Sequence, residues 1–152
     1  MNTELTRESL MQLNDFPNYY ASNLGNVYRK KKNGSYRKLK PYHGGSNRGS
    51  GDKGKYEVVC IYQGGAKYRK YVHQLVLEAF QGPRPFAHYQ ACHNDGNRLN
   101  NVNWNLRWDS PQGNMADAKK HKEERERQEE AKATLKGDNM DRELDKEVNN
   151  VR

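Results

Sequence analysis

The sequence predicts an α+β fold in which short antiparallel strands precede a long, charged C-terminal helix. Three observations lead to this class. Between residues 19 and 72, short runs rich in tyrosine and valine alternate with turns rich in asparagine and glycine, as in small antiparallel sheets. The run from His73 to Phe80 has the length and pattern of two helical turns. From Ser110 onward, alanine, glutamate, lysine and arginine dominate, and these residues favour a helix.

The N-terminal half is expected to be mostly sheet. Residues 2–12 carry leucine and methionine at irregular helical spacing, so we expect a short helix there, closed by Pro17. Residues 43–55 are rich in glycine, serine and asparagine and predict a flexible loop. Gly64-Gly65 is the turn of a predicted β-hairpin. The predicted strands are residues 19–21, 27–29, 36–39, 56–62 and 67–72.

The second half begins with the helix from His73 and continues with a turn-rich hairpin over residues 88–110, where asparagine and glycine are dense. Ser110 followed by Pro111 is typical of a helix start, and the helix should run to about Leu135 and end before Gly137. Beyond Gly137 we expect a weak second helix or disorder. The chain is thus expected to divide into three regions, residues 1–72, 73–118 and 119–152.

The positive charge is confined to one segment. The net charge is +8, and residues 28–72 alone carry +11 together with seven of the ten tyrosines. Basic residues interleaved with aromatics suit a surface that binds nucleic acid, although a solvated basic sheet face with tyrosines in a small core has the same composition. The predicted DNA contacts are Arg29, Lys30, Lys31, Lys32, Arg37, Lys38, Lys40, Lys67, Arg69 and Lys70.

Composition also excludes several classes of protein. The longest apolar stretch is a few residues, so no transmembrane helix and no membrane partner are expected. The N-terminus lacks the layout of a signal peptide, so we expect a cytoplasmic protein, in the host cell if a phage encodes it. Only Cys60 and Cys92 are present, without a CxxC motif, which argues against a disulfide scaffold or a cysteine zinc ribbon.

Three motifs between residues 72 and 118 point to a known family. They read VHQLVLEAF, ACHNDGNRLNNVNWNLRW and SPQGNMADA. Together they resemble the HNH endonucleases, also called ββα-metal or His-Me finger nucleases, in their phage and homing form. The upstream FPNYYASNLGNVYRK resembles the small DNA-binding motif that often precedes this nuclease core. The resemblance covers about 100 residues and implies an HNH core over 73–118 between a DNA-binding sheet region and a charged tail.

The resemblance implies a role for each matching residue. His93, at the end of the first hairpin strand, matches the general base, and an imidazole pKa near ~6.5 suits that task. Asn114 matches a metal ligand carried by the following helix. Asn105 matches the residue that ties the hairpin together and supports His93. Arg107 is a candidate phosphate contact or an ordinary surface residue, and His73 is a buried supporting residue or an active-site contact. The residues expected to shape the loop are Asp95, Gly96, Asn97 and Asn101.

One position departs from the family pattern, because Cys92 stands where the best-known members carry aspartate or asparagine as a second metal ligand. Thiolate is a soft ligand and matches Mg²⁺ poorly. Three readings follow. The ion, Mg²⁺ first, is held by Asn114, phosphate and water; or Cys92 ligates a softer ion, Mn²⁺ or Zn²⁺; or catalysis has decayed.

The predicted function is a metal-dependent DNA endonuclease that nicks or cuts double-stranded DNA. The alternative is a non-catalytic DNA-binding protein or an accessory subunit of a phage DNA-packaging machine with a decayed site. An RNA-binding module ranks below both, because no RNP-like motif is present. The charged tail lacks a recognisable sequence-reading module and is expected to bind a protein partner or to self-associate.

Overall fold

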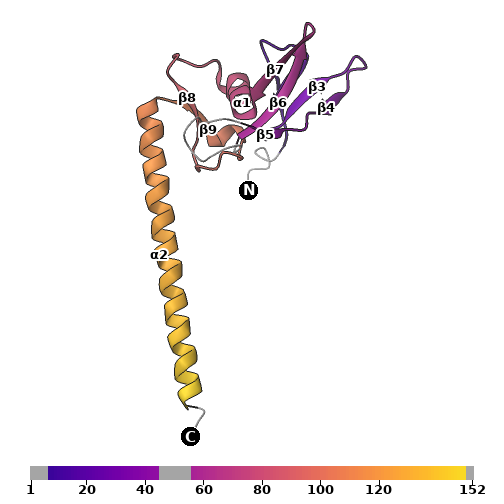
Figure 1. Cartoon of the computed structure of the whole chain (residues 1–152). Coiled ribbons are helices and arrows are strands. Elements are labelled where there is room, and N and C mark those ends of the chain that lie inside the picture. The colour runs from indigo at the N-terminus through magenta and orange to yellow at the C-terminus, as the bar shows by residue number, and fades with distance from the viewer. Residues whose placement is uncertain (1–6, 45–55, 150–152) are drawn as a thin grey trace. The chain divides into compact units, whose positions relative to one another are not determined.

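A computed structural model describes residues 7–44 and 56–149, with side chains up to residue 136. It contains nine strands, two helices and one 3-10 turn within this part of the chain (Figure 1). In chain order these elements are β1 (Leu10–Gln12), β2 (Tyr19–Ser22), β3 (Val27–Lys30), β4 (Tyr36–Lys38), β5 (Tyr42–Gly44), β6 (Tyr56–Gln63), β7 (Ala66–Tyr71), α1 (Val72–Gln81), β8 (Gln90–His93), η2 (Asn103–Asn105), β9 (Leu106–Asp109) and α2 (Pro111–Asn149).

The strands form three antiparallel sheets, ordered β1-β2-β3-β4, β5-β6-β7 and β8-β9. The predicted α+β class is confirmed, with its antiparallel sheets and C-terminal helix. The turn residues that located these strands behave as expected: Gly25, Gly34, Gly64 and Gly65 all adopt positive φ, the region where a residue without Cβ is unstrained.

Two predictions for the N-terminal half are wrong where the structure describes them. Leu10–Gln12 is not helical but is the edge strand β1, with Leu10 opposite Ser22 and Gln12 opposite Tyr20. The spacing of its apolar residues fits neither the helical nor the strand period well. Its pairing with β2 therefore decides its structure. His43 and Gly44 belong to β5 rather than to a loop, and His43 lies opposite Glu57 of β6. Residues 2–6 and 45–55 lie outside the described residues.

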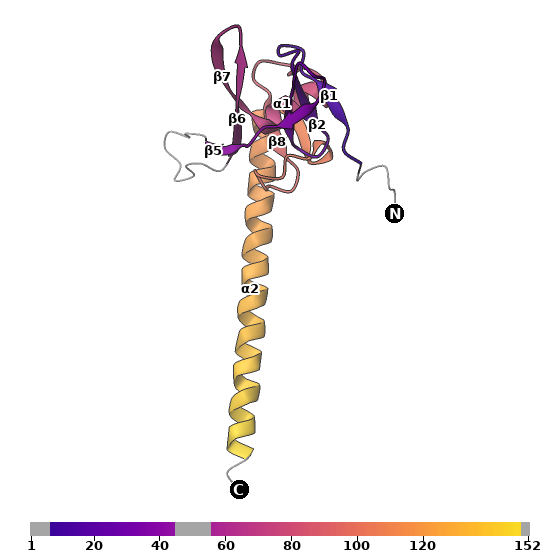
Figure 2. The same ribbon diagram turned by 90° about the vertical axis from the view of Figure 1, so that its right-hand side faces the viewer.

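The prediction that the C-terminal helix ends before Gly137 is also wrong. The helix α2 begins at Pro111, as expected, but continues to Asn149 (Figure 2). A glycine inside a helix costs only about 1 kcal/mol relative to alanine, and the strong helix formers that precede it offset this cost. Within α2, Lys119 lies 3.9 Å from Glu123 and Lys122 lies 3.7 Å from Glu126, the i,i+4 pairing that suits a solvated helix.

One hydrophobic core joins the N-terminal sheets to the hairpin. It includes Tyr19 of β2, Ile61 of β6, Leu75 and Leu77 of α1 and Leu106 of β9. Figure 1 shows α1 between the β8-β9 hairpin and strands β6 and β7, and α1 contacts all four. The chain divides into two compact units, residues 1–114 and 115–152, and all the core residues belong to the first. In the described part of the chain, no helix is long and apolar enough to cross a lipid bilayer.

Candidate functional site

The β8-β9 hairpin carries the predicted catalytic residues, and Asn105 fastens its loop. Asn105 is buried, and its Oδ1 accepts a hydrogen bond from the backbone N–H of Asp95 at 3.1 Å. Its Nδ2 donates to Asp95 Oδ1 at 2.9 Å and to the carbonyl of Asn100 at 2.8 Å. One amide therefore ties together both ends of the loop that follows His93.

His93 is the last residue of β8, and its side chain faces the interior. It is 9% exposed, and its Nε2 lies 3.0 Å from Oδ1 of Asn101. Burial lowers the pKa of His93 below its ordinary value, assisted by the charge of Arg98 and opposed by the Asn101 contact and by Asp95. A lowered pKa keeps the imidazole neutral at neutral pH, which is the state that accepts a proton.

Asn101 joins His93 to the N-terminal half of the chain. Its Nδ2 donates to Oε2 of Glu57 on β6 at 2.9 Å, across 44 residues of sequence. Its backbone packs on Gly25, where an added Cβ would lie 2.8 Å from the Asn101 carbonyl carbon and oxygen. The sequence analysis did not predict a role for Glu57. The one signal was its negative charge, since residues 28–72 contain only two acidic residues.

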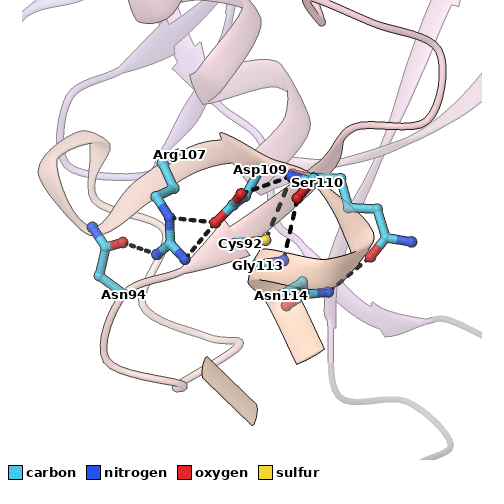
Figure 3. Close-up of polar contacts among 8 residues, drawn as sticks. Cys92, Asn94, Arg107, Asp109, Ser110, Gly113 and Asn114 are labelled. Atoms are coloured by element: carbon cyan, nitrogen blue, oxygen red, sulfur yellow. Dashed lines mark hydrogen bonds and ion pairs between the residues drawn. The ribbon is translucent and has the colours of Figure 1, made fainter. Parts of the chain in front are cut away.

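Asn114 lies in the first turn of α2 and reaches back to β8. The helix is capped by Ser110, whose Oγ accepts the N–H of Gly113 at 3.2 Å. Asn114 Nδ2 donates to Oε1 of Gln90 at 2.7 Å (Figure 3). Sequence reasoning also missed Gln90, which pairs with Asp109 at the start of the hairpin. The helix start and the hairpin thus bring two amide side chains together.

Comparison with known proteins places this arrangement in a family. Residues 70–116 match the model of the HNH endonuclease family. The HNH endonuclease L247 of Acanthamoeba polyphaga mimivirus, itself uncharacterized, is 33% identical over 105 residues, which are 69% of this chain and 24% of that protein. One solved structure is described as "DNA binding and cleavage by the HNH homing endonuclease I-HmuI". It superimposes on this chain with a TM-score of 0.56 and 29% sequence identity, and the match covers 72% of this chain and 56% of the solved chain. This chain therefore carries an HNH endonuclease segment over residues 70–116.

Cys92 and Arg107 lie opposite each other in the register of the HNH hairpin. Cys92 is 2% exposed, and its Sγ lies 3.6 Å from the carbonyl oxygen of Gln90. Arg107 binds Oδ2 of Asp109 through Nε at 3.1 Å and Nη2 at 2.9 Å, and it also contacts Asn94 (Figure 3). The hydrogen bond from Arg107 lowers the pKa of Asp109. The structure therefore places Arg107 in contacts that brace the hairpin.

A cleft lies beside the HNH hairpin, and His73 forms part of its wall. The cleft has a volume of about 400 Å³ and contains both Asn114 and Gln90. Burial and the neighbouring His93 lower the pKa of His73 to about 3, so this ring stays neutral. His73 is 5% exposed, and its Nδ1 has no hydrogen-bond partner among the described atoms. Other residues lining the cleft are Tyr56, Tyr71, Gln74, Arg84, Tyr89, Ala91 and Arg98.

The predicted DNA contacts fall into groups on the N-terminal sheets of the HNH protein. Five of them line one groove of about 760 Å³, together with Gln12, Pro17, Asn18 and Tyr20. These five are Arg29, Lys30, Lys31, Lys32 and Arg37. Three others, Lys67, Arg69 and Lys70, lie on β7. Lys38 ends β4, and Lys40 follows it. The sheet thus gathers half of the predicted contacts into a single concave surface.

Among the described residues, no group of three or more His, Cys, Asp or Glu side chains is placed to hold a metal ion. The cleft instead brings together the amide side chains of Asn114 and Gln90. Amide oxygens suit a hard cation such as Mg²⁺, which keeps several waters and completes its shell with substrate phosphate. The donor set therefore fits a loosely held, hard divalent ion better than a soft one.

Proposed function

We propose that the chain is a metal-dependent endonuclease that hydrolyses phosphodiester bonds of double-stranded DNA. The single observation that carries the proposal is the buried His93 at the end of β8, whose ring lies 5.2 Å from that of His73, in the wall of a cleft that also holds Asn114 and two arginines. The chain spans 24% of the curated relative it matches.

In the proposed reaction, His93 removes a proton from a water molecule whose oxygen bonds to phosphorus. The phosphorus–oxygen bond to the leaving sugar then breaks, and negative charge grows on the leaving oxygen. Arg84 and Arg98 line the cleft and supply positive charge to orient the phosphate. Since Arg98 also lies over the Tyr56 ring at 5.2 Å, its guanidinium is held at the cleft wall.

We further propose that the ion is Mg²⁺, or Mn²⁺ in its place, held by Asn114 and Gln90 with water and phosphate. When bound, it would stabilise the charge of the leaving oxygen. The burial of Cys92 supports the reading in which this thiol is not a ligand, because a 2% exposed sulfur packed against backbone is poorly placed to meet a hydrated ion. Zn²⁺ remains the alternative if the thiol does ligate.

A cleavage assay on supercoiled plasmid tests this function. We expect the wild-type protein to convert plasmid to nicked or linear DNA with Mg²⁺ or Mn²⁺ and to lose this activity in excess EDTA. Restoring the ion after EDTA should restore cleavage, which separates metal removal from denaturation. Activity with Zn²⁺ alone would favour the thiolate site. No cleavage with any of the three ions would favour the second candidate, a non-catalytic DNA-binding or packaging subunit, which the absent carboxylate at Cys92 supports.

The groove on the N-terminal sheet is proposed to bind the DNA backbone. Replacing Lys30, Lys31 and Lys32 with alanine should weaken DNA binding and flatten its salt dependence, because each phosphate contact releases condensed counterions. The slope of log K against log salt should fall by about 0.9 per lost contact on duplex DNA, hence by about 2 to 3 in all. Fluorescence anisotropy with a labelled duplex at several salt concentrations measures it.

The matched control for this variant replaces three lysines of α2, Lys119, Lys120 and Lys122, with alanine. It changes the net charge equally, yet two of these lysines lie within 4.0 Å of glutamates on the same helix. The control should retain the wild-type slope. An unchanged slope in the variant that lacks Lys30, Lys31 and Lys32 would show that the DNA backbone does not contact the groove. We also propose that α2 binds a protein partner or self-associates, and that the protein is cytoplasmic.

A further inference from the structure

We propose that Glu57 and Asn101 are positioning residues that fix the protonation pattern of the His93 ring, so that Nδ1 is the atom that accepts the proton. This inference rests on the proposed function, because the base role of His93 belongs to that function. The hydrogen-bond pattern itself follows from the structure alone, and it can be tested without any cleavage.

The pattern starts at Glu57. An ionised carboxylate only accepts hydrogen bonds, so the group that faces Oε2 of Glu57 at 2.9 Å must be the donating Nδ2 of Asn101. The two ends of an amide cannot both be donors, and the other end, Oδ1, therefore faces the ring of His93. The carboxylate thus determines which way round the Asn101 amide sits, a choice that is otherwise ambiguous for asparagine.

The amide in turn determines the ring. Oδ1 of Asn101 lies 3.0 Å from Nε2 of His93 and can only accept, so Nε2 must carry a hydrogen. A neutral imidazole carries one hydrogen on its two nitrogens, which leaves Nδ1 with a free electron pair. The proton taken from water therefore goes to Nδ1, while Nε2 stays bound to Asn101 throughout.

The surroundings hold this arrangement in place. Asn101 is 3% exposed and His93 is 9% exposed, so water competes poorly for their contact. The backbone of Asn101 rests against Gly25 of the β2-β3 turn, and the N–H of Asn103 donates to the carbonyl of Asn23 at 2.8 Å. Since the loop is anchored at two points of that turn, the amide is held between its partners.

The sharpest test reverses the polarity at position 57. A lysine only donates, so Glu57→Lys should turn the Asn101 amide around, present Nδ2 to the ring and move the ring hydrogen from Nε2 to Nδ1. Glu57→Gln can donate or accept and should give a mixture of the two forms. The control is Glu8→Lys, because Glu8 also accepts from an asparagine, Asn26, at 2.8 Å but does not contact His93.

The readout is the ¹⁵N chemical shifts of the two ring nitrogens of His93 in protein labelled with ¹⁵N-histidine. They are recorded near pH ~8.5, about two units above the ordinary imidazole pKa, and assigned with a His93→Gln sample. We expect hydrogen on Nε2 in the wild type and in Glu8→Lys, on Nδ1 in Glu57→Lys, and on both in Glu57→Gln. If Glu57→Lys fails to fold, Glu57→Gln, which preserves side-chain size, carries the test.

Hydrogen on Nδ1 in the wild-type ring, or an unchanged ring in the folded variants, would overturn the proposal. Single-turnover cleavage at saturating protein is the second measurement, chosen so that altered DNA affinity does not affect the rate. Glu57→Lys should lower that rate about 10- to 100-fold, less than the ~10²- to 10⁴-fold loss expected when a general base is removed altogether, and Glu57→Gln should lower it less. If the wild type does not cleave while the ring responds as expected, the proposed function fails and the hydrogen-bond assignment stands.

Discussion

Replacing His93 with glutamine should lower the rate of plasmid cleavage by about 10²- to 10⁴-fold, the usual contribution of a general base. Glutamine keeps a polar side chain near Asn101 but cannot take a proton from water at neutral pH. The affinity for DNA should stay within about twofold, since the predicted phosphate contacts lie on the N-terminal sheets. Single-turnover kinetics and anisotropy measure the two quantities separately.

The matched control is His88→Gln, the same substitution at an exposed histidine that stacks on Phe86. It should cleave at the wild-type rate. Cleavage by His93→Gln within about threefold of that control would mean that another group is the base. Loss of cleavage in both variants would instead point to histidine residues acting in DNA binding or folding.

Asn105→Ala should lower the free energy of unfolding by about 2 to 4 kcal/mol, because it leaves the backbone N–H of Asp95 and the carbonyl of Asn100 without their side-chain partner. The loop after His93 then loses the side chain that joins its two ends, so cleavage should fall by at least about tenfold under conditions where the variant is folded. Urea unfolding followed by circular dichroism gives the stability.

The control for this change is Asn97→Ala in the same loop. Asn97 is exposed, and its side chain accepts a single hydrogen bond, from the N–H of Leu99 at 3.1 Å. This variant should cost about 1 kcal/mol or less. Equal destabilisation by the two changes would contradict the role assigned to Asn105, since it would show that the loop responds to any lost asparagine.

Local patterns predicted much of the fold. The strands β2, β3, β4, β6 and β7 stand close to their expected positions because glycine turns separate them, and such turns depend on neighbouring residues only. The start of α2 at Pro111 followed from its capping residue, and the spacing from His93 to Asn114 led to the family. These signals are all contained in short stretches of sequence.

The wrong predictions share a different cause, which is pairing between residues that lie far apart in the sequence. The strand β1 exists because Leu10 faces Ser22, and β5 because His43 faces Glu57, and neither partner is visible in a local pattern. The same holds in the site. Glu57 reaches Asn101 across 44 residues, and Gln90 reaches Asn114 across 24. Apart from the acidic charge of Glu57 in a basic segment, the sequence contains no signal for either contact.

The contact between the β2-β3 turn and the loop after His93 limits where this chain can be divided. Here a junction at residue 72 would separate Gly25 and Asn23 from the loop residues they support, and Glu57 from Asn101. A transplantable HNH segment must therefore start upstream of β2, and a chimera that exchanges the sheet needs a glycine and an acid at the equivalent places to keep these contacts.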